Sequence, residues 1–126
     1  MKKIISTSHA PDAIGPYSQA VLVGGILYTA GQIAIIPKTG DLDLENITIE
    51  THQVMKNLEA VLSAADMDFS NVVKCTIFLK DMSQYPEINN VYAQYFSHKP
   101  PAREAVQVSR LPKDVNVEIS LIAVVL

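Results

Sequence analysis

The amino-acid sequence predicts a two-layer α+β domain in which a mixed β-sheet carries two helices packed on one face. Three observations support this fold class. Apolar residues alternate with period two in several short runs, they recur with helical spacing in two longer runs, and the runs follow the order hairpin, helix, strand, helix, strand, strand. A helix that joins two strands of one sheet makes a right-handed crossover, so we expect both helices on the same face. The other sheet face is then left uncovered.

Composition limits the classes of partner that the protein can have. The chain has 126 residues, of which 48% are hydrophobic and only 18% are charged, and its formal net charge is -3. This length predicts one domain over residues 1–126, and the low charge predicts extra buried surface between the subunits of a homo-oligomer. The acidic balance argues against nucleic acid as a partner. We expect no membrane partner and a cytoplasmic location, because no apolar run could span a bilayer and no signal-peptide core follows Met1.

The beginning of the chain predicts a short strand, a loop and a β-hairpin. Residues 4–8 form a possible edge strand, and the breaker-rich residues 9–16 form the loop. Two strands over residues 17–23 and 26–32 are joined by Gly24-Gly25. A two-residue glycine link is typical of a hairpin, because both positions can adopt positive φ.

The hairpin fixes a register that brings residues 15–18 beside residues 30–32 at its open end. Val21 is predicted opposite Tyr28, and Tyr17 opposite Gln32. Gly31 interrupts the second strand without a side chain, which leaves two interpretations open. It marks either a bulge or a place where another group approaches the backbone closely.

Two amphipathic helices are predicted, over residues 46–65 and 85–96. The apolar face of the first comprises Val54, Met55, Leu58, Val61, Leu62 and Ala65, with Asn57 among the residues of the polar face. The second helix has Pro86 in its first turn, where the missing N–H costs little. Its apolar stripe comprises Tyr85, Ile88, Tyr92, Tyr95 and Phe96, and we expect the tyrosines in the core rather than on a stacking surface.

The remaining strands also follow from alternation. Residues 72–80 present an apolar face of Val73, Cys75, Ile77 and Leu79, so Cys75 is predicted to be a small core residue and not a nucleophile. A single cysteine also fits a reducing compartment. The last strand, over residues 115–126, ends with apolar residues on both faces, which predicts a central position in the sheet. The three histidines have no metal-ligand spacing, and no metal site is predicted.

An arginine and a glutamate stand in the alternating strands near the end of the chain. If Val106, Val108 and Val117 face the core, Arg103 and Glu118 both point away from it, toward the uncovered sheet face. Two opposite charges on such a face form either a solvated or mutually paired surface, or a site.

Several blocks of sequence, in order along nearly the whole chain, resemble the RidA/YjgF family of reactive-intermediate deaminases, also called the L-PSP or translation-inhibitor family. These blocks are GPYSQA (15–20), LYTAGQI (27–33), MKNLEAVL (55–62), VKCTIFLKDM (73–82), NNVY (89–92), PAR (101–103) and LPKDVNVEI (111–119). The resemblance implies a chorismate-mutase-like α+β fold and a homotrimer whose sheets face the threefold axis, with clefts between neighbouring subunits.

The resemblance also implies an activity without a cofactor. Members of the family hydrolyse enamine and imine intermediates such as 2-aminoacrylate or 2-aminocrotonate to 2-oxo acids and ammonia, so a 2-iminobutanoate/2-iminopropanoate deaminase acting on a small carboxylate is expected. The catalytic positions of the family fall on Arg103, which binds the carboxylate, and Glu118, which positions water. The substrate-binding positions fall on Tyr17, Ala30, Gly31, Asn89, Arg103 and Ala105.

Two departures from the family pattern bear on substrate preference. Ala30 stands where many active members have serine, and Ala105 stands where they often have cysteine. Two other functions stay open from the sequence. One is a regulatory protein that binds small 2-oxo acids without catalysis. The other is an endoribonuclease or translation inhibitor, a role attached to some relatives, against which the acidic balance argues.

Overall fold

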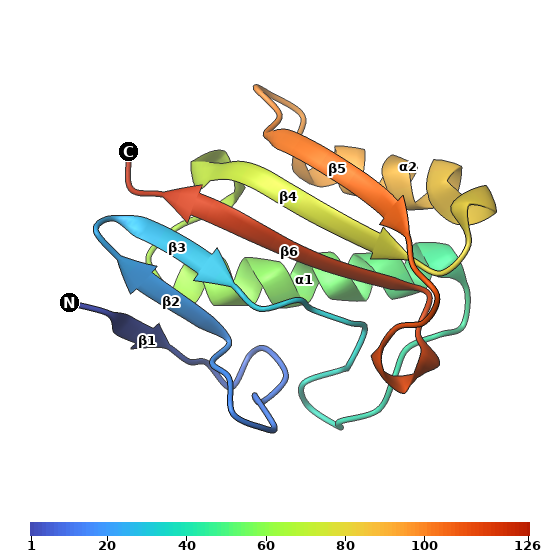
Figure 1. The fold of residues 1–126 in the computed structure, drawn as a ribbon, viewed down its shortest axis with the longest axis horizontal. Helices are drawn as coiled ribbons and strands as arrows, with labels where there is room; N and C mark the ends of the chain where they lie inside the picture. Colours follow the sequence, from blue (N-terminus) through green and yellow to red (C-terminus); the bar gives the residue numbers. More distant parts are fainter.

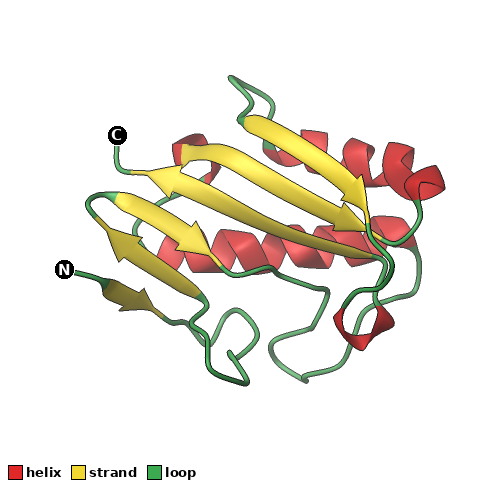
Figure 2. Cartoon of the chain, in the orientation of Figure 1, coloured by secondary structure: helices red, strands yellow, loops and turns green.

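The computed structural model describes residues 1–126 and consists of one six-stranded mixed sheet with two α-helices on one face (Figure 1). The strands lie in the order β1-β2-β3-β6-β4-β5. The elements are β1 (Lys3–Ile5), β2 (Ala20–Val23), β3 (Ile26–Thr29), α1 (Ile47–Ala64), β4 (Val72–Leu79), α2 (Tyr85–Tyr95), β5 (Ala102–Gln107) and β6 (Val117–Val124). The predicted α+β class, with both helices behind the same sheet face, is confirmed (Figure 2).

The connections explain why both helices share a face. Helix α2 joins β4 to β5, which pair in parallel, and every other strand pairing is antiparallel. A parallel pair needs a crossover, and right-handed crossovers place their helices on one side. Strand β6 lies between β3 and β4, which confirms the predicted central position of the last strand. Neither helix combines the length and the apolarity that a bilayer crossing demands.

The core lies between the helices and the sheet. Five of the six residues of the predicted apolar face of the first helix are buried there, and Ala65, which follows α1, is partly buried against them. Cys75 of β4 is also buried, as the alternation predicts. Asn57 is also buried, although the helical pattern placed it on the polar face. Its amide donates hydrogen bonds to the carbonyl groups of Ile33 (3.1 Å) and Ile35 (2.9 Å), which satisfies the buried polar group and ties the connection after β3 to α1.

The hairpin is shorter than its pattern predicts. Val21 lies opposite Tyr28 as expected, but the paired strands begin at Ala20 and end at Thr29. Beyond that point Gln32 exchanges two backbone hydrogen bonds with Ile119 of β6, at 2.8 and 3.1 Å. The predicted pairing of Tyr17 with Gln32 is therefore wrong, because the chain after β3 stays beside β6 and leaves β2.

The predicted orientation of Arg103 is also wrong. In the parallel β4–β5 pair Arg103 lies beside the buried Cys75, and Val106 lies beside Phe78. Val106 is 43% exposed, whereas Ala105 packs against the core. Arg103 and Ala105 thus face the helix layer and Val106 faces away from it. The register of the edge strand is imposed by β4, and the single valine of β5, Val106, is too weak a signal to reveal it.

Strand β4 departs from simple alternation at its start. The pairing with β6 shifts register between Val72 and Lys74. As a result Val72 is buried and Val73 is exposed, which reverses the prediction for Val73. An extra residue in one strand of a pair moves the following side chains to the other face, and a period-two pattern cannot reveal where this happens.

Candidate functional site

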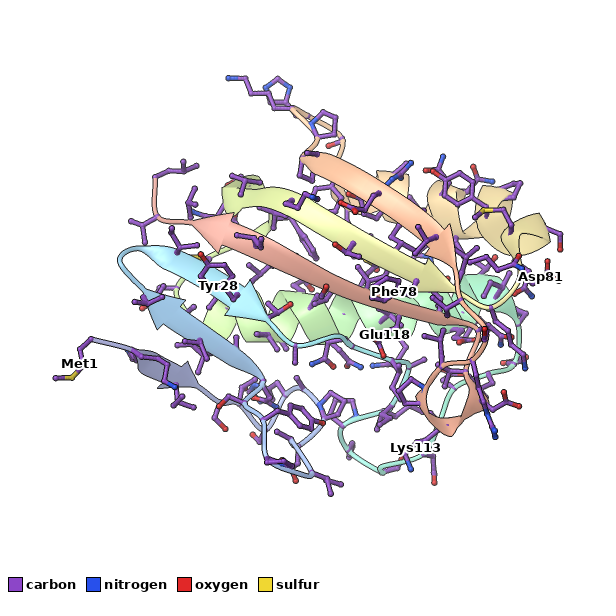
Figure 3. The ribbon with its side chains drawn as sticks, in the orientation of Figure 1. Met1, Tyr28, Phe78, Asp81, Lys113 and Glu118 are labelled. Carbon is purple, nitrogen blue, oxygen red and sulfur yellow. The ribbon has the colours of Figure 1, made fainter.

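The predicted site residues form two groups on opposite faces of the sheet. The first group lines a cavity of about 570 Å³ and comprises Tyr17, Ala30, Gly31 and Glu118. In β6 Glu118 lies opposite Phe78, on the sheet face that the helices leave uncovered (Figure 3). The loop that carries Lys113 contributes to the same cavity, at the end of the sheet where β6 begins (Figure 3).

Gly31 and Glu118 approach each other so closely that a Cβ atom at position 31 would displace the Glu118 side chain. The bridge between Gln32 and Ile119 places the two side by side. A Cβ atom at Gly31 would lie 2.5 Å from Oε2 and 2.7 Å from Cδ of Glu118. Of the two interpretations of Gly31, the close approach is the correct one, and the approaching group is this carboxylate. The N–H of Gly31 donates no hydrogen bond within the chain, so it remains available to a ligand.

The carboxylate of Glu118 has no partner in its own chain. It takes part in none of the three ion pairs, and burial alone raises its pKa above the ordinary carboxyl value. A carboxyl group of this kind shares a proton more readily near neutral pH than an exposed one does, which suits acid–base work.

Buried Gln19 fixes the loop that forms the rim of this cavity. Its Nε2 donates to the carbonyl groups of Thr7 (3.0 Å) and Pro11 (2.7 Å), and its Oε1 accepts from the N–H of Thr7 (2.7 Å). Sequence reasoning missed Gln19 because a glutamine at the start of a strand gives no periodic signal. The structure shows that its side chain replaces strand pairing in holding this segment.

The second group surrounds Arg103 on the helix-facing side of β5. Nη1 of the guanidinium donates to Oδ1 of Asn89 at 2.7 Å, and Nη2 donates to the hydroxyl of Tyr85. The guanidinium carbon also lies 4.8 Å from the ring centroid of Tyr92 and 5.4 Å from that of Tyr85. Two tyrosines and an asparagine therefore hold the arginine in place, and cation–π attraction adds to the hydrogen bonds.

Arg103 keeps both its charge and part of its donor set. No carboxylate of the chain pairs with it. Only two of the five N–H donors of the guanidinium are used by Asn89 and Tyr85. The remaining donors suit a planar carboxylate, which guanidinium binds in bidentate fashion.

The residues around Arg103 have a spacing in the sequence that predicts a shared helix face. Tyr85, Asn89 and Tyr92 have the spacing i, i+4 and i+7, which places them on one face of α2. The tyrosines were predicted in the core, and Tyr92 is indeed buried. A helix face that combines two tyrosines with an asparagine also predicts a polar partner, and that partner is Arg103.

Within one chain the two groups do not form one site. Asn89, Tyr92 and Arg103 line a separate cavity of about 410 Å³ with Pro100 and Pro101. This cavity shares no residue with the one that contains Glu118. Ala105 lines neither of them, but it belongs to β5, an edge strand whose backbone is unpaired on one side. The chain thus presents an unpaired cation and an unpaired acid from opposite faces.

Comparison with known proteins agrees with the residue blocks in the sequence. The family model described as Endoribonuclease L-PSP matches residues 7–125. A RutC family protein of Pyrococcus horikoshii is 51% identical over 123 residues, covering 98% of each chain. The human 2-iminobutanoate/2-iminopropanoate deaminase is 45% identical over 124 residues, covering 98% of this chain and 90% of the human protein.

Solved structures give the same result for the fold. The crystal structure of Escherichia coli TdcF with bound serine superposes with a TM-score of 0.93 at 41% identity, and the match covers 98% of this chain and 99% of TdcF. The family match spans residues 7–125, and the structural match covers nearly the same part of the chain. The chain therefore belongs to the L-PSP family, to which the RidA/YjgF proteins belong, as its sequence blocks predict.

Proposed function

We propose that this protein hydrolyses reactive enamine and imine intermediates, such as 2-aminoacrylate or 2-aminocrotonate, to 2-oxo acids and ammonia. It would then be a 2-iminobutanoate/2-iminopropanoate deaminase. The observation that carries the proposal is the Arg103 guanidinium, which is oriented by Asn89 and Tyr85 but has no carboxylate partner in its own chain. A charge held in this way is prepared for an anionic ligand, and the human relative named as such a deaminase supports the chemistry.

The proposed assembly is a homotrimer whose sheet faces surround the threefold axis. Each site then lies between two subunits and combines Arg103 of one with the Gly31–Glu118 cavity of its neighbour. Two features support this arrangement. The two halves of the site lie on opposite faces of one chain, and the uncovered sheet face exposes apolar side chains such as Tyr28, which is 45% exposed.

The proposed reaction begins with carboxylate binding. Arg103 and the free N–H of Gly31 hold the substrate carboxylate, and the enamine tautomerises to an imine with an electrophilic carbon. Glu118 accepts a proton from water as the oxygen attacks this carbon. The same carboxyl group delivers this proton to the nitrogen, which gives an intermediate with one hydroxyl and one amino group. Glu118 then takes the hydroxyl proton and passes it to the amino nitrogen as the C–N bond breaks and the C=O bond forms, so the 2-oxo acid and ammonia leave. General acid–base help of this kind contributes typically about 10²- to 10⁴-fold.

The proposed ligand is a small carboxylate that carries an amino or imino group. The serine bound in the TdcF structure is a molecule of this size and charge. In this chain Ala30 lines the cavity with a methyl group, so the wall has no hydroxyl at that position. We therefore expect apolar side chains such as those of 2-iminopropanoate and 2-iminobutanoate to be accepted.

A coupled assay tests the proposal. An auxiliary dehydratase generates 2-aminoacrylate, the protein is added, and disappearance of the imine is followed. We expect R103A to abolish turnover while circular dichroism shows an intact fold. We expect E118Q to lose most of the rate but to keep binding a 2-oxo acid. The control R110A changes an arginine whose side chain is 79% exposed, and it should retain full activity.

Other outcomes identify other functions. Binding of 2-oxo acids without any imine consumption by the wild type would indicate a regulatory binding protein. Degradation of RNA at moderate salt, lost in R103A, would indicate the activity in the name of the family model. Full activity of R103A would refute the proposed site.

A further inference from the structure

Helix α1 contributes a buried acid to the point where β6 begins. Glu50 is fully buried in the first turn of α1. Its Oε1 accepts from Nδ2 of Asn116 at 2.7 Å, and its Oε2 accepts from the backbone N–H groups of Asn116 (2.8 Å) and Val117 (3.3 Å). None of the ion pairs in the chain includes Glu50, so three N–H donors alone hold this carboxylate.

The location of these donors distinguishes this acid from an ordinary structural one. They belong to the two residues that immediately precede Glu118. On the other side of Glu118, Ile119 exchanges two backbone hydrogen bonds with Gln32, and this bridge sets the position of Gly31. The carbonyl of Asn116 also accepts from the N–H of Lys80, which extends the pairing with β4. The backbone of Glu118 is thus fixed at both ends.

The fixed position matters because the clearance around Glu118 is small. An added Cβ at Gly31 would lie within 3 Å of three atoms of the Glu118 side chain. A shift of β6 along its axis would change the distance between this carboxylate and a ligand at the N–H of Gly31. We propose that Glu50 is a positioning residue for Glu118, which it holds in place through Asn116 and the backbone that enters β6.

This inference rests on the proposed function, since it assigns a role in the same site. Burying a carboxylate is costly unless hydrogen bonds compensate for lost water. Stability alone would be served as well by an uncharged pair of side chains. The negative charge of Glu50 is explained if its side chain must accept hydrogen bonds from two backbone N–H groups and one side-chain amide at once. A carboxylate can do this because both of its oxygens only accept.

An exchange of the two partners tests the proposal. In N116D a second carboxylate faces that of Glu50, and neither side chain can turn to supply the N–H donor that Oε1 of Glu50 loses. In the double variant E50Q/N116D the donor and acceptor are interchanged and the contact is restored. We expect N116D to lower kcat about 10- to 100-fold with little change in KM, because misplacement by about 1 Å can cost 10²-fold. We expect the double variant to recover most of this loss.

Two further variants separate positioning from folding. T51V alters the neighbouring buried residue, whose hydroxyl bonds only within α1 to the carbonyl of Ile47 (2.7 Å), and it should leave kcat unchanged. N116A removes the side-chain donor but keeps both backbone donors, and it supplies a milder lesion if N116D does not fold. Wild-type kcat in N116D, or no recovery in the double variant, would overturn the proposal.

A second readout does not depend on turnover. The ¹³C carboxyl resonance of Glu118 reports its titration, while Asp12, Tyr17 and Lys113, the other ionisable groups around the cavity, are followed in the same samples. In N116A we expect the midpoint to fall toward the ordinary value as water reaches the loosened strand, and in E50Q/N116D we expect it to stay at the wild-type value. An unchanged midpoint in N116A contradicts the inference. If the wild type consumes no imine, the proposed function fails, and this titration still decides the role of Glu50.

Discussion

At the scale of single residues, the side chain of Glu118 occupies the space that a side chain at position 31 would need. The glycine leaves room for the carboxylate and keeps its own N–H unpaired, so both groups can reach one ligand. A hydroxyl or methyl group placed elsewhere on the cavity wall, as at Ala30, changes the shape of the cavity without touching this contact.

We expect G31A to lose activity while keeping its fold. The added Cβ would lie 2.5 Å from Oε2 of Glu118, so the carboxylate must swing away from its place. The expected loss in kcat is about 10²-fold, since the proposed acid–base group is displaced. The change in the free energy of unfolding should stay below about 1 kcal/mol, because a side chain and not the backbone gives way. Steady-state imine hydrolysis and urea unfolding measure the two effects, with A30S as the control that should retain most of the activity.

Glu118 should also make stability depend on pH. Burial raises its pKa in the folded protein above the ordinary value of 4.5, so the folded state binds this proton more tightly than the unfolded state. Stability then decreases as pH rises from the ordinary carboxyl pKa through the higher folded value. We expect E118Q to be more stable than the wild type at pH 7, and the difference to vanish below about pH 4. Urea denaturation at a series of pH values measures this, and an equal or lower stability of E118Q at pH 7 would contradict it.

At the scale of the elements, α1 both covers the sheet and anchors the site. Its N-cap is Asn46, whose Oδ1 accepts from the N–H of Ile49 at 2.9 Å. Glu50 follows in the first turn, so the cap and the clamp on β6 belong to the same end of the helix. A variant that loosens this end of α1 should therefore also displace the start of β6.

We expect N46A to lower the free energy of unfolding by about 1 kcal/mol, the usual cost of losing an N-cap side chain. N46S should restore most of this stability, since serine is also a good cap. Chemical denaturation of the three proteins tests this prediction. An unchanged midpoint for N46A would mean that packing of α1, and not its cap, determines where the helix begins.

The sequence predicts the elements better than it predicts their edges. The six-residue apolar stripe of α1 and the glycine link of the hairpin are strong local signals, and the structure confirms both elements. The orientation of Arg103 was wrong because an edge strand such as β5 takes its register from its neighbour. The clamp of Glu50 on Asn116 joins residues 66 positions apart, and no local periodicity encodes such a contact.

The candidate site was predicted only as a set of residue types at family positions. That Tyr17, Ala30, Gly31 and Glu118 share a cavity is a property of the fold, and so is the distance of this cavity from Arg103. Buried Gln19 and Asn57, which hold the surrounding loops, could not be found because isolated amides have no pattern. Tyr85 and Tyr92 could have been found from their spacing with Asn89 on α2.

At the scale of the whole molecule, the separation of the two groups leads to a prediction about mixed assemblies. If each proposed site takes Arg103 from one subunit and Glu118 from the next, a trimer that mixes R103A and E118Q chains contains one intact site. Random mixing in equal amounts should then restore roughly a quarter of the sites, as follows from cyclic symmetry. Co-refolding of the two inactive proteins and the imine assay measure this. No recovery, with mixed trimers demonstrated by mass spectrometry, would place both residues of a site in one chain.

The opposite placement of Arg103 and Glu118 also has a genetic consequence. If the proposed site is shared between subunits, two alleles that each abolish the chemistry would complement one another when expressed in one cell, provided that one damages the arginine side and the other the acid side. Two lesions on the same side would not. A cross of inactive alleles would thus sort the mutations by the face of the protein on which they lie, without any structure being consulted.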